Sequence, residues 1–289
     1  MSVTVKRAGN RGYWRASWRK LRRNPLTMFA LLLFMGLTLA SVFAPLIAPY
    51  DPLKQNYTEL RKPPSAAYPF GTDDIGRDVF SRVIWGGRES LPVAFIAVGM
   101  GVVGGVVIGL ISGYYGGLLD TVIQRVLEII MAFPTVLLLL AIVAALGPNL
   151  ATVMIAIGFS SIPGYARLVR ASVLSAKNMD YITASRALGA ADRAIMFRHI
   201  LPNVIAPIII YGTLGLGNAI LVTAGLSFIG LGAQPPSPEW GSMLLYGRQF
   251  LRQAWWMSVF PGLAVFIAVL CINLLGDGLR DALDPKHSG

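Results

Sequence analysis

Apolar residues dominate long uninterrupted stretches of this chain, and the polar residues gather between them. Each stretch has about 20 residues or more, which at a rise of 1.5 Å per residue is enough to cross roughly 30 Å of hydrocarbon. Helices that are apolar all round are typical of membrane spans. The pattern therefore predicts an all-α polytopic membrane protein with six transmembrane helices. The expected spans are residues 28–48, 91–113, 121–146, 150–169, 206–229 and 257–276.

The charge distribution gives these spans an orientation. Of the 289 residues, 55% are hydrophobic and 13% are charged, and the formal net charge is +11. With the N-terminus in the cytoplasm, the inner segments hold 17 Lys and Arg against 7 acidic residues, and the outer segments hold 8 against 7. This excess agrees with the positive-inside rule. We therefore expect both termini in the cytoplasm, and we interpret the basicity as topology and not as nucleic-acid binding.

The chain is expected to divide into four regions. Residues 1–24 are a basic cytoplasmic segment that lies on the membrane surface, because Trp14, Trp18 and Leu21 fall on one helix face among basic residues. A secretory signal peptide is the alternative, but the apolar run that follows is longer than the 7 to 15 residues of a signal core. The other regions are an N-terminal span with its periplasmic loop (25–80), the main transmembrane domain with a cytoplasmic loop at 170–203 (81–284), and a short tail (285–289).

The cytoplasmic loop contains the strongest candidate for a docking element. Ala184, Ala187 and Leu188 fall on one face of a short helix, which Gly189 is expected to end. Pro202 is expected to end a second helix. The prediction is a helix, a tight turn and a second helix, with a small-residue face for a partner. The basic residues here are Arg167, Arg170, Lys177, Arg186, Arg193 and Arg198.

Metal and nucleotide chemistry lack the residues that they need. His199 and His287 are the only histidines and have no second ligand at metal spacing, and Cys271 is the only cysteine. No lysine follows a glycine, so there is no G-x-x-x-x-G-K-[ST] phosphate loop. We therefore expect neither a metal site nor nucleotide bound by a phosphate loop.

Three aspartates in the first periplasmic loop could suggest a calcium site. Asp73, Asp74 and Asp78 lack the alternating spacing with which a loop wraps the cation. We expect helix caps and salt bridges instead.

Glycines in the second span also invite two interpretations. Residues 99–104 match G-x-G-x-x-G formally, but a dinucleotide site needs a strand before the motif. Gly101, Gly105, Gly109 and Gly113 recur every four residues, which favours close packing of a neighbouring helix.

Few polar residues lie deep within the spans. In the third span Phe133 precedes Pro134, which is expected to kink the helix. Asn218 and Thr223 in the fifth span and Asn273 in the sixth could form interhelical hydrogen bonds or contact a substrate. Because ion-coupled carriers normally bury charges along their path, we expect the energy for transport to arrive from outside the spans. An ion-coupled carrier and a membrane enzyme are the weaker alternatives.

Several segments together resemble one known family. The chain is similar over nearly its whole length to the second, or C, permease subunit of dipeptide, oligopeptide, glutathione and nickel ABC importers. The segments that carry this resemblance are APYDP, YPFGTDDIGRDVFSRVIWGGR, GYYGGLLD, GLSFIGLGAQPPSPEWGSML and NLLGDGLRDALDPK.

The cytoplasmic signature of this family, E-A-A, three residues, G, nine residues and I-x-L-P, fits in part. Ala184, Gly189, Leu201 and Pro202 match it, whereas Thr183, Ser185 and His199 replace its glutamate, second alanine and isoleucine. Docking is then expected to rely on shape, with Arg186 and Asp192 as flanking charges. The resemblance implies an ATPase-coupling loop formed by Asp180, Tyr181, Thr183, Ala184, Ser185, Arg186, Ala187, Leu188, Gly189, Ala190 and Asp192. The candidate path residues are Phe133, Asn218 and Thr223.

The resemblance also implies the assembly. It predicts a type I ABC importer permease fold in the inner or plasma membrane of a prokaryote, working by alternating access. The expected partners are a homologous second permease, two ABC ATPase subunits that bind ATP and Mg²⁺, a periplasmic or lipid-anchored binding protein, and membrane lipid. The chain itself would bind no cofactor and would not be an enzyme. The motif Y-x-T-A-S-R favours a dipeptide-type member; glutathione, longer peptides and nickel are alternatives.

Overall fold

The computed structural model describes residues 18–283, and within this range the chain is built from helices. An isolated antiparallel bridge joins Thr72 to Asp78. The α-helices are α2 (Pro25–Val42), α3 (Ala44–Ile47), α4 (Val79–Tyr115), α5 (Gly117–Ala132), α6 (Thr135–Leu146), α7 (Leu150–Ala176), α8 (Asp180–Ala187), α9 (Asp192–Ala194), α10 (Leu201–Phe228), α11 (Trp240–Gly247) and α12 (Trp256–Leu283). A π-helical turn, η1 (Ile195–Ile200), and a 3-10 turn, η2 (Arg248–Phe250), complete the set.

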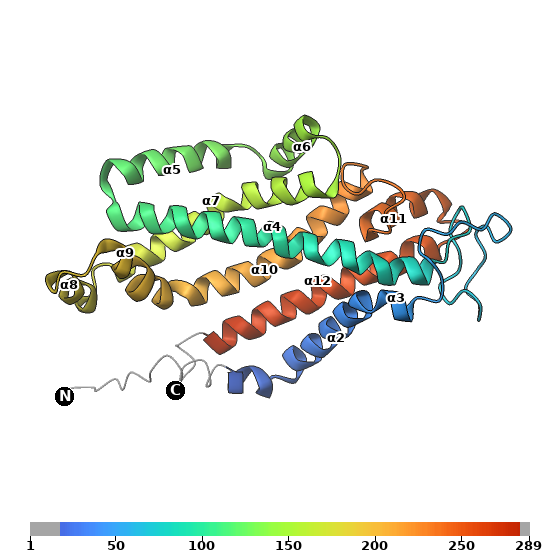
Figure 1. The fold of residues 1–289 in the computed structure, drawn as a ribbon, viewed down its shortest axis with the longest axis horizontal. Helices are drawn as coiled ribbons and strands as arrows, with labels where there is room; N and C mark the ends of the chain where they lie inside the picture. Colours follow the sequence, from blue (N-terminus) through green and yellow to red (C-terminus); the bar gives the residue numbers. More distant parts are fainter. Residues whose placement is uncertain (1–17, 284–289) are drawn as a thin grey trace.

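The long helices lie side by side in an elongated bundle with two distinct ends (Figure 1). One end carries α8 and α9 together with the start of α2 and the end of α12. The opposite end carries α3, α11 and the loop that precedes α4. Five helices are long and apolar enough to cross a membrane: α2, α4, α7, α10 with the turns before it, and α12. The described part of the chain therefore starts and finishes at the end that carries α8.

The predicted third span is broken rather than kinked. Helices α5 and α6 meet at an angle of 88°. Phe133 takes an extended conformation (ψ 133°), as a residue before proline must, and α6 begins directly after Pro134. If this pair is one span, the described residues contain six spans; otherwise they contain five.

The glycine stripe packs α4 against α7, as its spacing predicted. A Cβ added at Gly101 would lie 2.0 Å from Oγ of Ser161, and one at Gly105 would lie 2.3 Å from Cβ of Tyr165. Helices that approach this closely leave no room for a larger side chain, so the two helices are held in a fixed register.

Helix α4 begins well before its apolar run. Asp78 caps its N-terminus by accepting a 2.7 Å hydrogen bond from the amide of Ser81. The first turns include Arg82, whose charge made this segment look aqueous in the sequence. At 37 residues α4 extends beyond the hydrocarbon thickness.

The prediction for Pro202 was wrong. It lies in the first turn of α10 and does not end a helix, because a proline in a first turn lacks only an amide that has no helical partner. The π-helical turn η1 leads directly into α10, so the chain crosses this point without a break.

The N-terminal surface helix is described only in part. Residues 18–23 are helical, Leu21 is buried, and Trp18 is exposed with the Arg22 guanidinium 5.2 Å from its ring centre. Trp14 and the tail 285–289 lie outside the described residues.

Candidate functional site

Helix α8 is fixed to the bundle through one side chain. Ile182 has no exposed surface and packs into an apolar cluster with Leu110, Val173, Ile195 and Ile200. These residues come from α4, α7 and η1, so three elements support α8 from beneath. The inner side of α8 is therefore well packed, although the helix lies at one end of the molecule (Figure 1).

The opposite face of α8 is open and mostly small. Leu188 is 88% exposed. Gly189 (φ +79°) ends the helix, and its left-handed conformation is one that glycine adopts without a Cβ clash. The helix and tight turn predicted from sequence are confirmed. The other exposed residues of this face are Thr183, Ala184, Arg186 and Ala187.

A hydrogen-bonded group ties this turn to α4. The hydroxyl of Tyr114, in the last turn of α4, donates a 2.5 Å hydrogen bond to Oδ1 of Asp192. Nη2 of Arg186 donates to the same hydroxyl at 3.4 Å, and its guanidinium carbon lies 5.6 Å from the ring centre. The two predicted flanking charges thus meet at one tyrosine, which sequence reasoning missed.

The remaining residues of the expected coupling loop stabilise α8 locally. Asp180 is exposed in the first turn, where a negative charge suits the helix dipole. Ser185 Oγ donates to the carbonyl of Tyr181 at 2.8 Å, and the Tyr181 hydroxyl accepts from Asn203 Nδ2 at 3.2 Å. Ala190 closes the turn, since its amide donates to the Ser185 carbonyl at 3.1 Å.

A second connection at this end joins α5 to α7. Arg170 donates two hydrogen bonds to Asp120, from Nε at 2.7 Å and from Nη2 at 2.6 Å. Such a bidentate pair is directional as well as charged. Ser112 of α4 donates to the same carboxylate, and Lys177 Nζ donates to the Gly113 carbonyl at 3.0 Å. The pair therefore links three helices.

The predicted path residues do not meet in one place. Phe133 is 57% exposed at the break between α5 and α6. Asn218 is exposed on α10, whereas Thr223 is 1% exposed, and its Oγ1 has no hydrogen-bond partner in the described part of the chain. Asn273 lies against Gly217, with its Oδ1 2.7 Å from the position of a Cβ there.

A cavity of about 210 Å³ adjoins Phe133 and brings together polar residues that the sequence analysis did not select. Ser160 and Ser161 come from α7 and Tyr211 from α10. The sequence feature that could have identified these residues is the same as for Asn218, namely a polar side chain within an apolar span.

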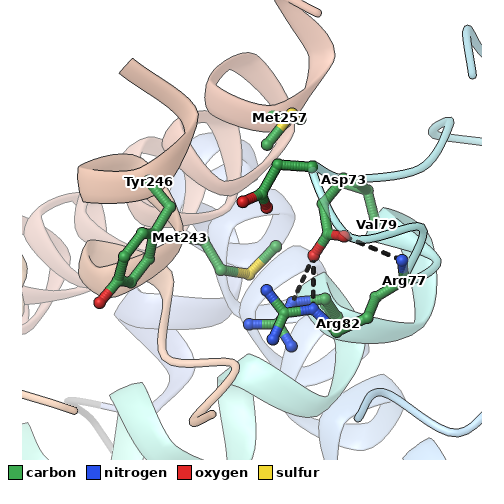
Figure 2. A pocket seen from close by; sticks show the side chains of 8 residues that line it. Asp73, Arg77, Val79, Arg82, Met243, Tyr246 and Met257 are labelled. Carbon is green, nitrogen blue, oxygen red and sulfur yellow. Dashed lines mark hydrogen bonds and ion pairs between the residues drawn. The ribbon is translucent and has the colours of Figure 1, made fainter. Parts of the chain in front are cut away.

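The opposite end of the bundle holds a buried ionic cluster (Figure 2). The Asp73 carboxylate lies between two arginines, with Oδ2 2.6 Å from Nε of Arg77 and 3.7 Å from Nε of Arg82. The cavity beside them measures about 10 Å³, the space of about one water molecule. The predicted salt bridges and the Asp78 cap are confirmed. In the described range no group of three or more His, Cys, Asp and Glu could hold a metal ion.

Arg82 and a buried glutamate join this cluster to the segment before α11. Arg82 Nη1 donates to the Pro52 carbonyl at 2.9 Å, and Nη2 donates to the Ser237 carbonyl at 3.2 Å. Glu239 caps α11 by accepting from the Ser242 amide at 2.8 Å and also accepts from Ser90 Oγ at 3.2 Å. Two loops far apart in sequence are thereby fastened to the start of α4.

Burial raises the pKa of the Asp74, Asp78 and Glu239 carboxyls above their ordinary values. Oδ1 of Asp74 and Oδ1 of Asp78 are buried without a hydrogen-bond partner among the described residues. The charged forms of these two aspartates are therefore only partly compensated.

A helical bundle of this length and apolarity, with a short exposed helix at one end, defines a polytopic transmembrane protein. The model of the family described as "binding-protein-dependent transport system inner membrane component" matches residues 105–289. The N-terminal transmembrane domain of oligopeptide transport permease C matches residues 12–64. The chain belongs to this family of inner-membrane transport components, and the resemblance to C-type ABC transporter permeases is confirmed.

Curated relatives match along almost the whole chain. A dipeptide transport system permease protein of Alkalihalophilus pseudofirmus is 46% identical over 94% of this chain and 90% of its own length. A di/tripeptide transport system permease protein of Pseudomonas aeruginosa is 44% identical over 93% and 91%. A glutathione transport system permease protein of Escherichia coli is 46% identical over 96% and 91%.

Solved structures agree on the fold. An inward-facing methionine ABC transporter aligns with a TM-score of 0.56 at 21% identity, covering 70% of this chain and 96% of that one. An amino acid ABC transporter aligns with a TM-score of 0.53 at 20% identity, covering 68% and 92%. At these identities the likeness shows a shared architecture, that of ABC transporter membrane subunits.

Proposed function

We propose that this chain is the C-type permease subunit of an ATP-driven, binding-protein-dependent importer of short peptides in the inner membrane of a prokaryote. The observation that carries the proposal is the construction of α8. Its small outer face is free to enter a groove, while Ile182 and the Tyr114 hydrogen bond anchor it to the bundle. A rigid short helix transmits displacement that a flexible loop would absorb.

The coupling path begins at the residues of α8. An ATPase subunit that binds ATP and Mg²⁺ receives Ala184, Ala187 and Gly189 in a groove, and Leu188 fills an apolar depression there. Movement of the ATPase displaces the turn at Asp192, and the hydrogen bond to Tyr114 carries this displacement into α4. A second, homologous permease completes the pathway and its own short helix engages a second ATPase, so that the pathway opens alternately to the two sides. In this orientation α8 and both termini are cytoplasmic, and a binding protein delivers substrate at the α11 end.

The substrate class is a short peptide. Relatives named for dipeptides and for glutathione have equal identity to this chain, so identity does not choose between them. Glutathione is itself a tripeptide, and both substrates therefore share peptide chemistry. The Y-x-T-A-S-R motif around Thr183 and Arg186 favours the dipeptide type.

The decisive experiment is uptake by the complete transporter in proteoliposomes, with ATP enclosed and binding protein outside. We expect dialanine uptake to require ATP and to survive an uncoupler. Leu188→Asp should prevent association of the ATPase and abolish uptake, because it places a charge where an apolar contact is expected. Leu188→Met is the matched control: it keeps an apolar side chain at this 88% exposed position and should retain uptake. Uptake that collapses with the uncoupler and persists without ATP would instead establish an ion-coupled carrier.

A further inference from the structure

The cavity beside Phe133 lies near mid-depth of the bundle. Ser161 is eleven residues into α7, about 16 Å from its start and so about half of a 30 Å hydrocarbon layer. Tyr211 occupies a similar middle position in α10. Residues of α5 and α6 on both sides of the 88° break form the remaining wall.

Broken backbone at this depth restricts what the cavity can face. The last carbonyls of α5 and the first amides of α6 have no partner within their own helices. Lipid provides neither donors nor acceptors, so irregular backbone within a membrane is tolerated only where protein or a water-filled space covers it. The break and the cavity therefore face protein or water rather than lipid.

The side chains around the cavity offer both hydrogen-bond donors and acceptors. Tyr211 lines the cavity, and its phenol hydroxyl can donate to a ligand carbonyl. Ser160 Oγ donates to the Ile157 carbonyl of its own helix at 3.0 Å, so its lone pairs remain for a ligand N–H. Gly164 makes room for the tyrosine, since a Cβ there would lie 3.0 Å from its hydroxyl oxygen.

No residue that lines the cavity is charged. The lining instead combines the exposed ring of Phe133 and the side chains of Ile130, Met131 and Leu138 with four hydroxyl residues, Thr135, Ser160, Ser161 and Tyr211. A donor, acceptors and an apolar wall suit an amide group with a side chain beside it. A charged terminus would find no counter-ion here, so the site would not trap a zwitterion.

We propose that this cavity is a peptide contact site in the translocation path, where Tyr211 hydrogen-bonds a peptide carbonyl and Ser160 accepts from a peptide N–H. Phe133 supplies a non-selective apolar contact for the side chain. This inference rests on the proposed function. It specifies the chemical group that the site recognises, which is the neutral peptide group common to all short peptides.

Thiol labelling tests whether the cavity contains water and whether a peptide occupies it. Cys271 is 1% exposed, so a single new cysteine can be followed in the assembled transporter. Ser160→Cys should react with a membrane-impermeant thiol reagent about tenfold faster than Leu32→Cys, because the reactive thiolate forms only in contact with water. Leu32 is the matched control, being 57% exposed midway along α2 on the far side of the bundle. Saturating dialanine should slow labelling at position 160 severalfold.

Each labelling result either supports or overturns the proposal. Labelling at position 160 that dialanine slows supports the proposal. Labelling that dialanine does not change means water without peptide contact, and no labelling means that protein or lipid covers the cavity; both overturn it. ATP-driven uptake in the same liposomes tests the proposed function separately, because a transporter without uptake fails that proposal whatever the labelling pattern.

A hydroxyl deletion provides a second readout. Tyr211→Phe should lower peptide transported per ATP hydrolysed about fivefold, the effect of one lost hydrogen bond, while binding-protein-stimulated ATP hydrolysis continues. Tyr115→Phe removes the hydroxyl of a 52% exposed tyrosine that neither lines the cavity nor lies at the α11 end, and it should leave the ratio unchanged. If Tyr211→Phe transports as much peptide per ATP as the unchanged protein, Tyr211 does not donate a hydrogen bond to the peptide.

Discussion

Tyr114 and Asp192 lie 78 positions apart in the sequence, and a 2.5 Å hydrogen bond joins them. Tyr114 belongs to the last turn of α4, and Asp192 begins the segment that follows the tight turn after α8. Because α4 is 37 residues long, displacement of α8 at one end of the bundle has a direct route to the other end.

Tyr114→Phe should therefore weaken coupling more than stability. The variant loses the partly buried hydrogen bonds to Asp192 and from Arg186, worth about 1 kcal/mol together because the second is long, so the melting temperature should fall by only a few degrees. Uptake per ATP hydrolysed should fall several-fold in proteoliposomes. Asp192→Asn keeps an acceptor for the hydroxyl and serves as the control with an intermediate effect. A normal transport ratio in Tyr114→Phe would show that displacement does not pass through this bond.

Substitutions at Gly189 separate backbone strain from docking. A Cβ there would meet no atom within 4 Å, so Gly189→Asn should fold with a small loss of stability, since asparagine tolerates a positive φ. Gly189→Trp adds bulk to the outer face and should uncouple binding-protein-stimulated ATP hydrolysis. Comparing stimulated hydrolysis and melting temperature in the two variants distinguishes these effects. Retained stimulation and transport in the tryptophan variant would argue against docking through this face.

The stability that the ion pair of Asp120 and Arg170 provides should depend on the planar, two-donor geometry of the arginine. Arg170→Lys keeps the charge but loses the bidentate fork, so it should destabilise the protein by about 1 kcal/mol or more. A double-mutant cycle with Asp120→Asn, measured by thermal unfolding in detergent, checks this. A coupling energy near zero would contradict a structural role for the pair.

Asp74 should make stability depend on pH. Burial raises the pKa of its carboxyl above 3.8 in the folded state, so folding disfavours the charged form, and this cost is present at neutral pH and disappears as pH falls through the raised pKa. Asp74→Asn should raise the melting temperature at pH 7 by a few degrees, and the difference should vanish near about pH 4.

The neighbouring aspartate is the control for that measurement. Asp73 is paired with Arg77 and Arg82, so Asp73→Asn should lower the melting temperature at pH 7. If both variants behave alike, the partnerless oxygen of Asp74 is not the cause of the pH dependence.

The sequence predicted the positions of the five long apolar helices, because hydropathy depends on local composition alone. It did not predict where helices end when polar residues are satisfied by tertiary contacts. Arg82 precedes the predicted span 91–113, yet it lies inside α4, where the carbonyls of Pro52 and Ser237 accept hydrogen bonds from its guanidinium. Pro202 looked like a helix end, yet the π-helical turn before it lets the chain continue.

The docking helix α8 could be predicted because its signals lie close together in the sequence, whereas the residues that hold it against the bundle could not. A helix face of small residues and a glycine stop can be recognised from neighbouring positions such as Ala184 and Gly189. Tyr114 comes from a helix about 70 residues earlier, and its hydrogen bond depends on how α4 packs. The cavity polarity at Tyr211 has the same origin, since it requires four helix segments to meet.

The order in which the chain is made follows from the link between α5 and α7. Asp120 leaves the ribosome fifty residues before Arg170, so its ionic partner does not yet exist when α5 is synthesised. Until then the carboxylate, in the first turn of α5, has Ser112 of the already synthesised α4 as its hydrogen-bond donor. The bidentate link is therefore a late contact: it forms only once α7 has been made, and it then fastens α7 to α5 and α4 together.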